Sequence, residues 1–230
     1  MPTNPNTLAI IVPILNESHA LPALTNHLRH WQSRGAEIVL VDGGSSDGSP
    51  ERLETADFRV IRAPRGRARQ MNAGAQASHA QYLLFLHADT RLPDAADTHV
   101  LAALQRPSGE NWGRFDVRIE GRSRILPMVA WFMNHRSRLT GIATGDQSLF
   151  MTRAAFKQVG GFPDQPLMED VEICKRLKQI RSPVCLKHRV TTSGRRWDTH
   201  GSWRTIWLMW QLRWAYWRGT PAEQLAERYS

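Results

Sequence analysis

The sequence predicts an α/β fold with a mostly parallel central sheet and helices on both of its faces. Two observations carry this prediction. In the first hundred residues, short apolar runs alternate with longer amphipathic segments, and polar or glycine-rich turns follow the apolar runs. Such alternation is typical of βαβ units, whose right-handed crossovers bring the carboxyl ends of the strands to one edge of the sheet.

The first half of the chain contains four expected strands, which are the apolar runs 8–15, 37–42, 58–63 and 82–87. The segments between them have the spacing of amphipathic helices, over residues 19–34, 46–56 and 66–79. Each of the first three strands is thus followed by a helix that can return the chain to the start of the next parallel strand.

The pattern is less regular after residue 107. We expect an exposed strand over 112–121, a buried or capping helix over 125–135, a strand over 147–152, a charged amphipathic helix over 169–180, a late strand over 183–192 and a helical tail over 203–217. This gives the α/β sheet a C-terminal helical segment.

Composition limits the function classes. Thirty Lys and Arg against 21 Asp and Glu leave a formal net charge of +9 in 230 residues, which favours an anionic partner such as a nucleotide, a phosphate or an anionic lipid surface. No helix-turn-helix, zinc-finger or RNP pattern supports nucleic acid. Only Cys174 and Cys185 occur, which fits a reducing cytoplasm. We expect neither a signal peptide nor a transmembrane helix.

Polar residues follow three of the strands. The first strand ends in PILNE, the second in DGGSSDG and the fourth in HADT. Ligands bind at the carboxyl ends of strands in open parallel sheets. Although Asn, Asp, Gly and Ser also make ordinary turns, three such loops at successive strand ends favour a ligand site. His87 and Asp89, two positions apart, could hold a divalent metal there.

The residues that predict phosphate binding are arginines rather than a glycine-rich loop. The chain has neither a GxxxxGK[ST] loop nor a GxGxxG register, which disfavours a P-loop enzyme and a dinucleotide fold. Instead, Arg65, Arg67 and Arg69 crowd the start of an expected helix, where free backbone N–H groups also attract anions. This segment is either a diphosphate site or a solvated basic face.

An ordered set of motifs resembles the family-2 glycosyltransferases. The segments are IIVPILNE, LVDGGSSDGS, GRARQMNAG, LFLHADT, GDQSLFMTRAAFKQVGGFP and MEDVEICKRL, between about residues 8 and 194. The resemblance implies the GT-A fold, inverting transfer from a UDP-sugar such as UDP-glucose or UDP-N-acetylglucosamine, and Mn²⁺ or Mg²⁺. It also implies a domain over 1–194, with a nucleotide-binding half (1–106) and an acceptor half (107–194), and leaves 195–230 as a Trp-rich amphipathic extension.

The resemblance assigns roles to individual positions. It implies donor-binding roles for residues of the first three motif loops, namely Pro13, Leu15, Glu17, Asp42, Arg67 and Asn72. The triplet His87-Ala88-Asp89 stands where the family has DxD, and Asp170 matches the proposed catalytic base.

The triplet departs from the family because His87 replaces its first Asp. We expect Asp89 to remain the direct metal ligand. His87 either ligates manganese, which tolerates imidazole better than magnesium does, or hydrogen-bonds the diphosphate or sugar, and we favour the second role.

A resemblance to one subgroup of the family concerns the acceptor. LFLHADT, GDQ, GGFP and TSGRRW together resemble a subgroup that includes the selenosugar synthase of selenoneine biosynthesis, in which selenophosphate receives the sugar. Selenium is already a strong nucleophile, so such an acceptor needs positive charge more than base assistance. Arg195 and Arg196, with Lys187 and Arg189, could supply that charge, bind the donor diphosphate or serve solubility alone.

The tail suggests an alternative. Five tryptophans fall at helical spacing beside arginines: Trp203, Trp207, Trp210, Trp214 and Trp217. Such a stripe is typical of packing or a homodimer contact, but also of a helix at a membrane surface, where the acceptor would be a sugar or lipid-linked hydroxyl. A non-catalytic nucleotide-sugar-binding protein remains the remote alternative.

Overall fold

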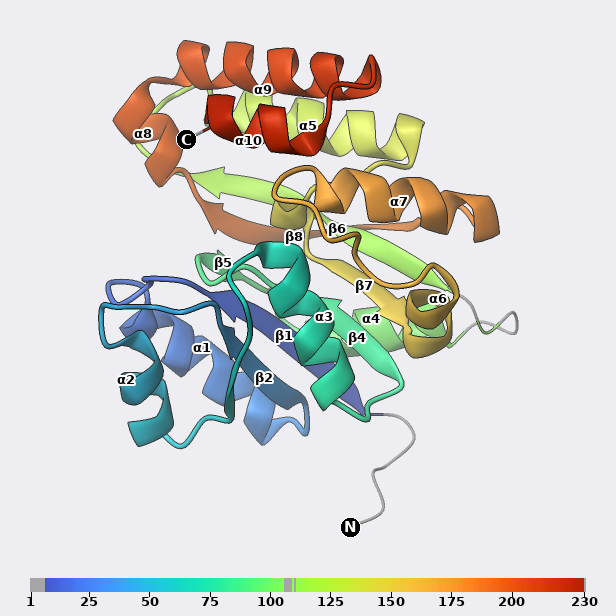
Figure 1. Cartoon of the computed structure of the whole chain (residues 1–230). Coiled ribbons are helices and arrows are strands. Elements are labelled where there is room, and N and C mark those ends of the chain that lie inside the picture. The colour runs from blue at the N-terminus through green and yellow to red at the C-terminus, as the bar shows by residue number, and fades with distance from the viewer. Residues whose placement is uncertain (1–6, 106–108, 110, 230) are drawn as a thin grey trace.

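The expected α/β fold is confirmed in a computed structural model, which describes residues 7–105, 109 and 111–229 (Figure 1). One eight-stranded sheet runs through both expected halves of the chain, in the order β3-β2-β1-β4-β7-β6-β8-β5. The expected boundary at residues 106 and 107 and the first six residues, where a leader was expected to be absent, lie outside the described residues.

Four of the seven neighbouring strand pairs are parallel. Their bounds are β1 Leu8–Ile14, β2 Glu37–Asp42, β3 Val60–Arg62, β4 Tyr82–Phe85, β5 Thr90–Arg91, β6 Trp112–Glu120, β7 Leu149–Thr152 and β8 Val184–Ser193.

The helices follow the expected positions and add α4, α6, α8 and α10. Their bounds are α1 Leu21–Ser33, α2 Ser49–Thr55, α3 Arg67–Ala77, α4 Ala96–Leu104, α5 Leu126–Thr140, the 3-10 turn η1 Gly145–Gln147, α6 Arg153–Gln158, α7 Glu169–Ile180, α8 Arg195–His200, α9 Ser202–Trp217 and α10 Ala222–Tyr229. Among the described residues, no helix combines the length and the apolar character needed to cross a bilayer.

Strand β7 departs from the parallel pattern, and this departure shapes the site. It runs antiparallel to both β4 and β6, so it begins at the edge where β1, β2 and β4 end. The η1 turn, immediately before β7, therefore joins the loops that follow the parallel strands. Strand β8 is parallel to β6 and ends at this edge as well.

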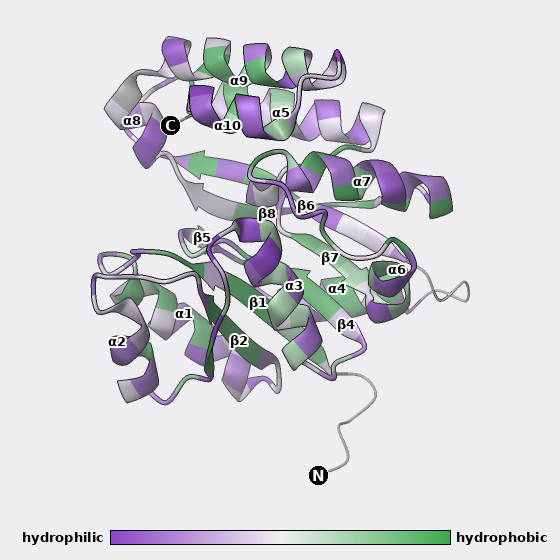
Figure 2. Ribbon diagram, viewed as in Figure 1, coloured by the Kyte–Doolittle hydropathy of each residue, from purple (hydrophilic) through white to green (hydrophobic). Residues whose placement is uncertain are grey.

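Two apolar layers hold the helices to the sheet. Alternate residues of β1 face opposite sides: Ile10 and Val12 lie in one core with α1 and α4, whereas Ala9 and Ile11 lie in the other with α3 and α7. This is the period-2 alternation of a strand that is buried on both faces, and Figure 2 shows the resulting apolar centre.

A layer formed by α5, α8, α9 and α10, here called the helical roof, lies at one end of the molecule beyond β6 and β8 (Figure 1). A third, small core ties it to the domain, because Leu212 of α9 and Leu225 of α10 are buried with Met168, the residue before α7. The roof thus rests on the turn that begins α7.

The expectation of an exposed strand over 112–121 is wrong. Strand β6 lies between β7 and β8, and its polar residues Arg114 and Asp116 are buried as an ion pair that also includes Arg138 of α5. The buried pair gives a central strand the composition of an exposed one. The helix expected over 125–135 runs to Thr140 and buries one face only, leaving Trp131 and Phe132 exposed.

Candidate active site

The loops after β1 and β2 form one side of the site. Asn16 N–H donates to Ser45 Oγ (2.9 Å), and Ser46 N–H donates back to Asn16 Oδ1 (2.9 Å). Asp42 is buried, and its carboxylate accepts from Gly44 N–H (2.9 Å) and Ser45 N–H (3.1 Å). These bonds fix the turn that follows β2.

Strand β4 ends at Phe85, so the triplet His87-Ala88-Asp89 lies in a turn beyond it, closed by Thr90 N–H donating to His87 O (3.0 Å). The strand expected over 82–87 therefore ends two residues earlier, before His87. The Asp89 carboxylate is exposed, Ala88 packs at the rim of the first core, and His87 is largely enclosed, with Nδ1 3.4 Å from Asp146 Oδ1.

Glu17 connects the loops after β1 and β2 with the turn that contains His87-Ala88-Asp89. Burial raises the pKa of Glu17, the charge of Arg195 lowers it and that of Asp89 raises it again. The Glu17 carboxylate lies 4.0 Å from the Arg195 guanidinium. The β1 loop, the triplet turn and the start of α8 therefore meet, and Pro13 and Leu15 lie half-buried at the same end of β1.

The centre of the site is a cluster of one cation and three carboxylates. Arg67, the first residue of α3, faces Glu169, Asp170 and Asp146, and its Nη1 lies 3.5 Å from Glu169 Oε1. Gly145 N–H donates to Asp170 Oδ2 at 2.8 Å, which ties the start of α7 to η1. Asp170 is therefore held towards the site and does more than complement a helix dipole.

The charged groups in this cluster shift one another's pKa values. Burial raises the pKa of Glu169, and Asp170 raises it further while Arg67 lowers it. Desolvation works against ionisation of Asp146, but the hydrogen bond from His87 and the charges of Arg67 and Arg213 hold its pKa below the usual value. Carboxylates with opposite pKa shifts side by side are typical of catalytic sites.

Backbone strain gathers around the same edge. Asn16 (φ +54°), Ser148 (φ +46°) and Met168 (φ +64°) are non-glycine residues in the left-handed region. Each such conformation costs about 1 kcal/mol or more. The three residues adjoin Glu17, η1 and Glu169 respectively. Asp57 and Ala95 have the same conformation away from the site, so three of the five such residues in the described part of the chain lie in turns that orient the site.

The residues fit a divalent metal only in part. No cluster of three or more His, Cys, Asp or Glu side chains suited to a metal occurs in the described part of the chain. His87 offers little, because Nδ1 faces Asp146 and Nε2 is buried. Asp89 does fit, since Mg²⁺ is commonly held by one or two carboxylates together with substrate phosphates and water.

Two predicted donor residues have other partners in the structure. Asn72 Nδ2 donates to Phe162 O (2.8 Å) and Asn72 Oδ1 accepts from Phe162 N–H (2.9 Å), so this side chain ties α3 to the GGFP loop. Arg196 stacks on the Tyr229 ring (3.7 Å) and donates to Tyr229 O (3.2 Å). Arg196 therefore fastens α8 to α10, whereas Arg195 reaches the site.

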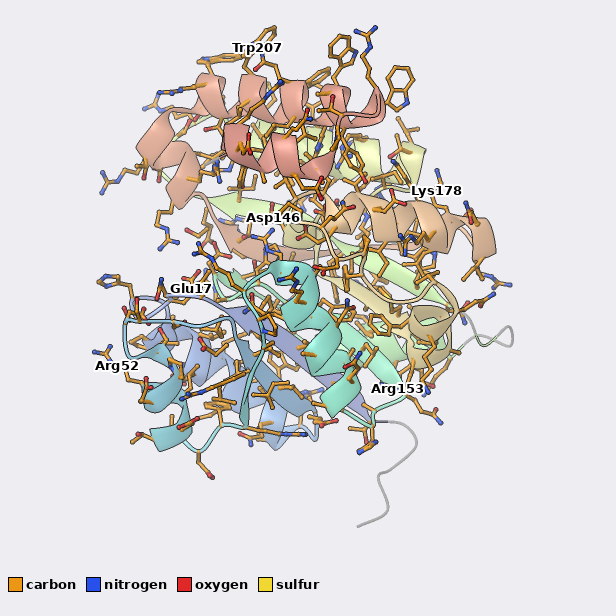
Figure 3. All side chains as sticks on the ribbon, viewed as in Figure 1. Glu17, Arg52, Asp146, Arg153, Lys178 and Trp207 are labelled. Carbon is orange, nitrogen blue, oxygen red and sulfur yellow. The ribbon has the colours of Figure 1, made fainter. Side chains whose placement is uncertain are left out.

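Sequence reasoning missed Asp146 and Glu169 as site residues. Both lie in quoted motifs, GDQ and MED, so a signal was present. It was ambiguous because the position of η1 depends on the antiparallel direction of β7. Figure 3 labels Glu17, in the loop after β1, and Asp146, on η1.

The site encloses little space. A cavity of ≈ 10 Å³ lies among Arg67, His87, Gly145, Glu169 and Asp170, which is room for no more than about one water molecule. The bulk of a nucleotide must therefore lie outside this enclosed volume.

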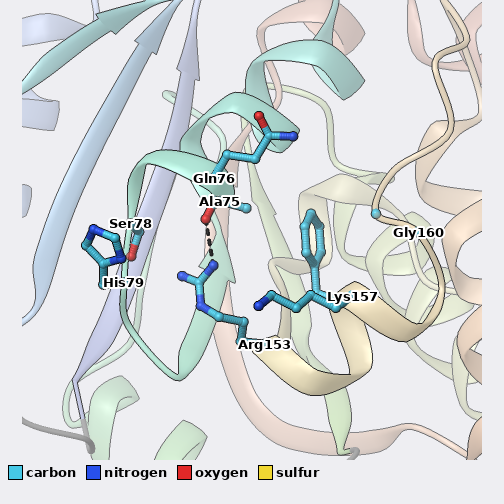
Figure 4. A pocket seen from close by; sticks show the side chains of 9 residues that line it. Ala75, Gln76, Ser78, His79, Arg153, Lys157 and Gly160 are labelled. Carbon is cyan, nitrogen blue, oxygen red and sulfur yellow. Dashed lines mark hydrogen bonds between the residues drawn. The ribbon is translucent and has the colours of Figure 1, made fainter.

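A larger hollow of ≈ 450 Å³ lies between the end of α3 and α6 (Figure 4). It is at the opposite edge of the sheet, and Arg153 beside it donates to Ala75 O (2.7 Å) and Ala80 O (2.6 Å). These bonds satisfy carbonyls at the end of α3 and before β4. We therefore place the chemistry at the smaller cavity, where the carboxylates gather.

A sequence model described as glycosyl transferase family 2 matches residues 9–160, well over half of the chain. The chain belongs to glycosyl transferase family 2. The matched range includes every loop of the site except the start of α7 and α8.

Curated family relatives are distant or partial. A poly-β-1,6-N-acetyl-D-glucosamine synthase of Staphylococcus epidermidis is 21% identical over 186 residues, which cover 74% of this chain and 45% of the relative. A PGL/p-HBAD biosynthesis glycosyltransferase of Mycobacterium tuberculosis is 35% identical over 100 residues, covering 38% of this chain and 37% of the relative. The chain thus spans less than half the length of these relatives.

Solved structures share the fold. A mannosyltransferase of Pyrobaculum calidifontis in complex with GDP-Man and Mn²⁺ superposes with a TM-score of 0.62 at 18% identity, over 93% of this chain and 62% of the other. TarS of S. aureus in complex with UDP-GlcNAc gives 0.63 at 14% identity, over 81% and 58%. These likenesses support the GT-A fold of this family-2 member.

Proposed function

We propose that this family-2 protein transfers a sugar from a UDP-sugar, with inversion and with the help of Mn²⁺ or Mg²⁺, to a small anionic acceptor. The observation that carries the proposal is the convergence of Arg67, Asp146, Glu169 and Asp170 where the parallel strands end. Complexes of fold neighbours with UDP-GlcNAc and with GDP-Man and Mn²⁺ support a nucleotide-sugar donor.

On this proposal the donor lies along the loops that follow β1, β2 and β4. Pro13, Leu15 and Asp42 line the nucleoside end. Arg67, half exposed, faces the diphosphate, where a guanidinium stabilises the negative charge of departing UDP. Asp89 would hold the divalent ion, whose chemistry when bound is to neutralise that same charge.

Asp170 is the proposed catalytic base. Its Oδ2 accepts from Gly145 N–H, and a carboxylate has further lone pairs with which to take a proton from an acceptor hydroxyl. Asp170 and His87 both border the small cavity. His87 Nε2 has no hydrogen-bond partner among the described residues and is buried, so on the role that we favour the imidazole turns to hydrogen-bond the sugar or the diphosphate.

The best-supported acceptor class is a small anion, and selenophosphate is our specific proposal. It rests on the resemblance of the motifs and on the cations of β8 and of the start of α8. Arg195 lies 4.0 Å from Glu17, whereas Lys187 and Arg189 are exposed on β8, four or more residues before the strand ends at the site.

Two arginine variants, one of them a control, test the donor part of the proposal. Arg67→Gln should weaken Mn²⁺-assisted UDP binding roughly 10- to 100-fold, as expected for loss of a charge-assisted contact. Arg69→Gln is the matched control, because Arg69 lies on the same helix, is equally exposed and pairs with Asp164. Equal UDP affinity in both variants, measured by calorimetry, would contradict the donor site.

The acceptor is identified by product analysis. Mass spectrometry would follow UDP-glucose and UDP-N-acetylglucosamine, each with selenophosphate or a sugar acceptor. A product with a selenium–carbon bond supports the selenosugar proposal, and its absence from an enzyme that transfers to hydroxyls rejects it. A protein that binds UDP-sugar but neither transfers nor hydrolyses it would instead be the non-catalytic alternative.

A membrane-surface acceptor is the second candidate, favoured by the tryptophans of α9. Successive helical residues are about 100° apart, so the five tryptophans fall within an arc of about 80°. They are 58–79% exposed and lie opposite the buried Leu212. Trp207 points away from the body of the protein in Figure 3. Tryptophan flanked by arginine, here Arg204 and Arg218, suits the interface of an anionic bilayer.

This candidate is tested by substitution rather than truncation, since removing α9 would expose Met168 next to the site. The triple variant Trp207→Gln, Trp210→Gln, Trp214→Gln should lose flotation with phosphatidylglycerol liposomes and keep its melting temperature. Wild-type protein that stays at the bottom of the gradient would contradict membrane binding. The tryptophan stripe would then be a homodimer contact, which light scattering would detect.

A further inference from the structure

Two arginines of the helical roof act electrostatically on Asp170 and have no ion-pair partner among the described residues. Arg136 of α5 has Nε and Nη2 buried with no hydrogen-bond partner in the described part of the chain. Arg213 of α9 is partly buried, and within the described residues no carboxylate lies within 4.0 Å of either guanidinium. Both nevertheless interact electrostatically with Asp170.

The elements that carry these arginines are firmly fixed. On α5, Asn134 and Ser137 flank Arg136 and bind Gln147 Nε2 of η1 at 3.2 and 3.0 Å. On α9, the Tyr216 hydroxyl, one turn after Arg213, donates to Glu172 Oε2 of α7 at 3.1 Å. Arg136 is thus anchored beside η1 and Arg213 beside the first turn of α7, which are the two segments that hold Asp170.

An unpaired buried guanidinium is costly, and a second cation nearby adds to the cost. Burial lowers the pKa of Arg136 to about 10, and the charge of Arg213 lowers it as well. The folded protein therefore maintains two mutually repelling cations at one place. An anion that reaches both would relieve the repulsion and supply the missing hydrogen-bond acceptors.

The pair does not act on the loop that follows β1, although Arg213 also acts on Asp146, which Arg67 faces. The groups that act on Glu17 are Arg195, Asp89, Asp47 and His87, and neither roof arginine is among them. Arg136 instead interacts electrostatically with Asp170, Cys174 and Arg114. A catalytic base must lie next to the nucleophile that it deprotonates, so cations that act on Asp170 are placed to act on the acceptor as well.

We propose that Arg136 and Arg213 form an anion subsite for the acceptor, which takes a phosphate-sized dianionic group next to Asp170. This inference rests on the proposed function where it identifies the bound anion as the acceptor. Binding of an anion at this site does not require turnover. A free phosphate-like ion and the phosphate of a short-chain lipid present the same chemistry to the two guanidinium groups.

Calorimetry of the full chain saturated with UDP and Mn²⁺ tests the subsite, with inorganic phosphate in one arm and dihexanoyl phosphatidic acid in the other. Arg136→Gln and Arg213→Gln should each weaken binding at least tenfold in the arm that wild type binds. Arg52→Gln, which removes an exposed charge from α2, should match wild type. The arm with the tighter wild-type binding identifies whether the anion is free or lipid-borne.

Several results would overturn the subsite: wild-type protein that binds neither probe, variants that bind phosphate as wild type does, or variants that lose UDP affinity as strongly as phosphate affinity. The last would place the arginines at the donor diphosphate. Melting temperatures of both variants should equal or exceed that of wild type, because an unpaired buried charge is removed. If wild type fails to bind UDP, the proposed function fails, and the phosphate titration repeated without UDP still decides the subsite.

Discussion

Gly145 is the position where the smallest change should disturb the site most. An added Cβ would lie 2.4 Å from His87 Nε2 and 2.5 Å from His87 Cε1. Since ordinary contacts need about 3.5 Å, Gly145→Ala must push the imidazole away by about 1 Å. Gly145 does not have a positive φ, so alanine fits the backbone, and its N–H can still donate to Asp170. The clash with His87 is therefore the main perturbation.

Overpacking of this kind costs about 1–3 kcal/mol of folding stability, and a misplacement of about 1 Å at a reacting centre reduces turnover on the order of 100-fold. Urea unfolding measures the first quantity, and release of UDP from UDP-sugar measures the second.

A double-mutant cycle provides the decisive control. In the His87→Ala background the ring is absent, so Gly145→Ala should then cost less than about 0.5 kcal/mol. An equal loss of stability in both backgrounds would refute the contact that we hold responsible. Turnover in the His87→Ala background should likewise be insensitive to the second substitution.

Three further predictions address the base, the pH dependence of stability and a buried ion pair. Asp170→Asn should reduce transfer to a sugar hydroxyl by about 10²- to 10⁴-fold while sparing much of the transfer to selenophosphate; an equally severe loss with both acceptors, compared by mass spectrometry, argues against an unassisted nucleophile. Burial, with the charges of His30 and Arg91, lowers the pKa of His27 to about 4, and its Nε2 accepts from Trp31 Nε1 (3.1 Å) and Leu92 N–H (3.0 Å). Because the unfolded chain binds the proton more tightly, stability should fall by up to about 3 kcal/mol as pH drops from about 6.5 to 4, and urea unfolding of His27→Gln should lack this component. Asp116→Ala should lower stability by about 3–5 kcal/mol, because it leaves the buried Arg114 unpaired, whereas a loss in urea below 1 kcal/mol would show that the pair is not desolvated.

Local patterns predicted most of the secondary structure. The strand over 37–42 and the helix over 169–180 have the expected bounds, because apolar runs of strand length and helical periodicity report burial directly. The exposed strand expected over 112–121 failed for a physical reason: Arg114 and Asp116 neutralise each other inside the protein, and a sequence does not show that pairing.

The sequence by itself determined the α/β fold, the family and the loops that carry the chemistry, because these depend on periodicity and on motifs that are contiguous in the chain. Only the tertiary structure decided how those loops meet. The antiparallel course of β7 brings Asp146 to the edge where β4 ends, and packing of α9 on Met168 brings Arg213, from the far end of the chain, towards Asp170. Such contacts depend on strand direction and helix packing, which are set by the whole core rather than by neighbouring residues.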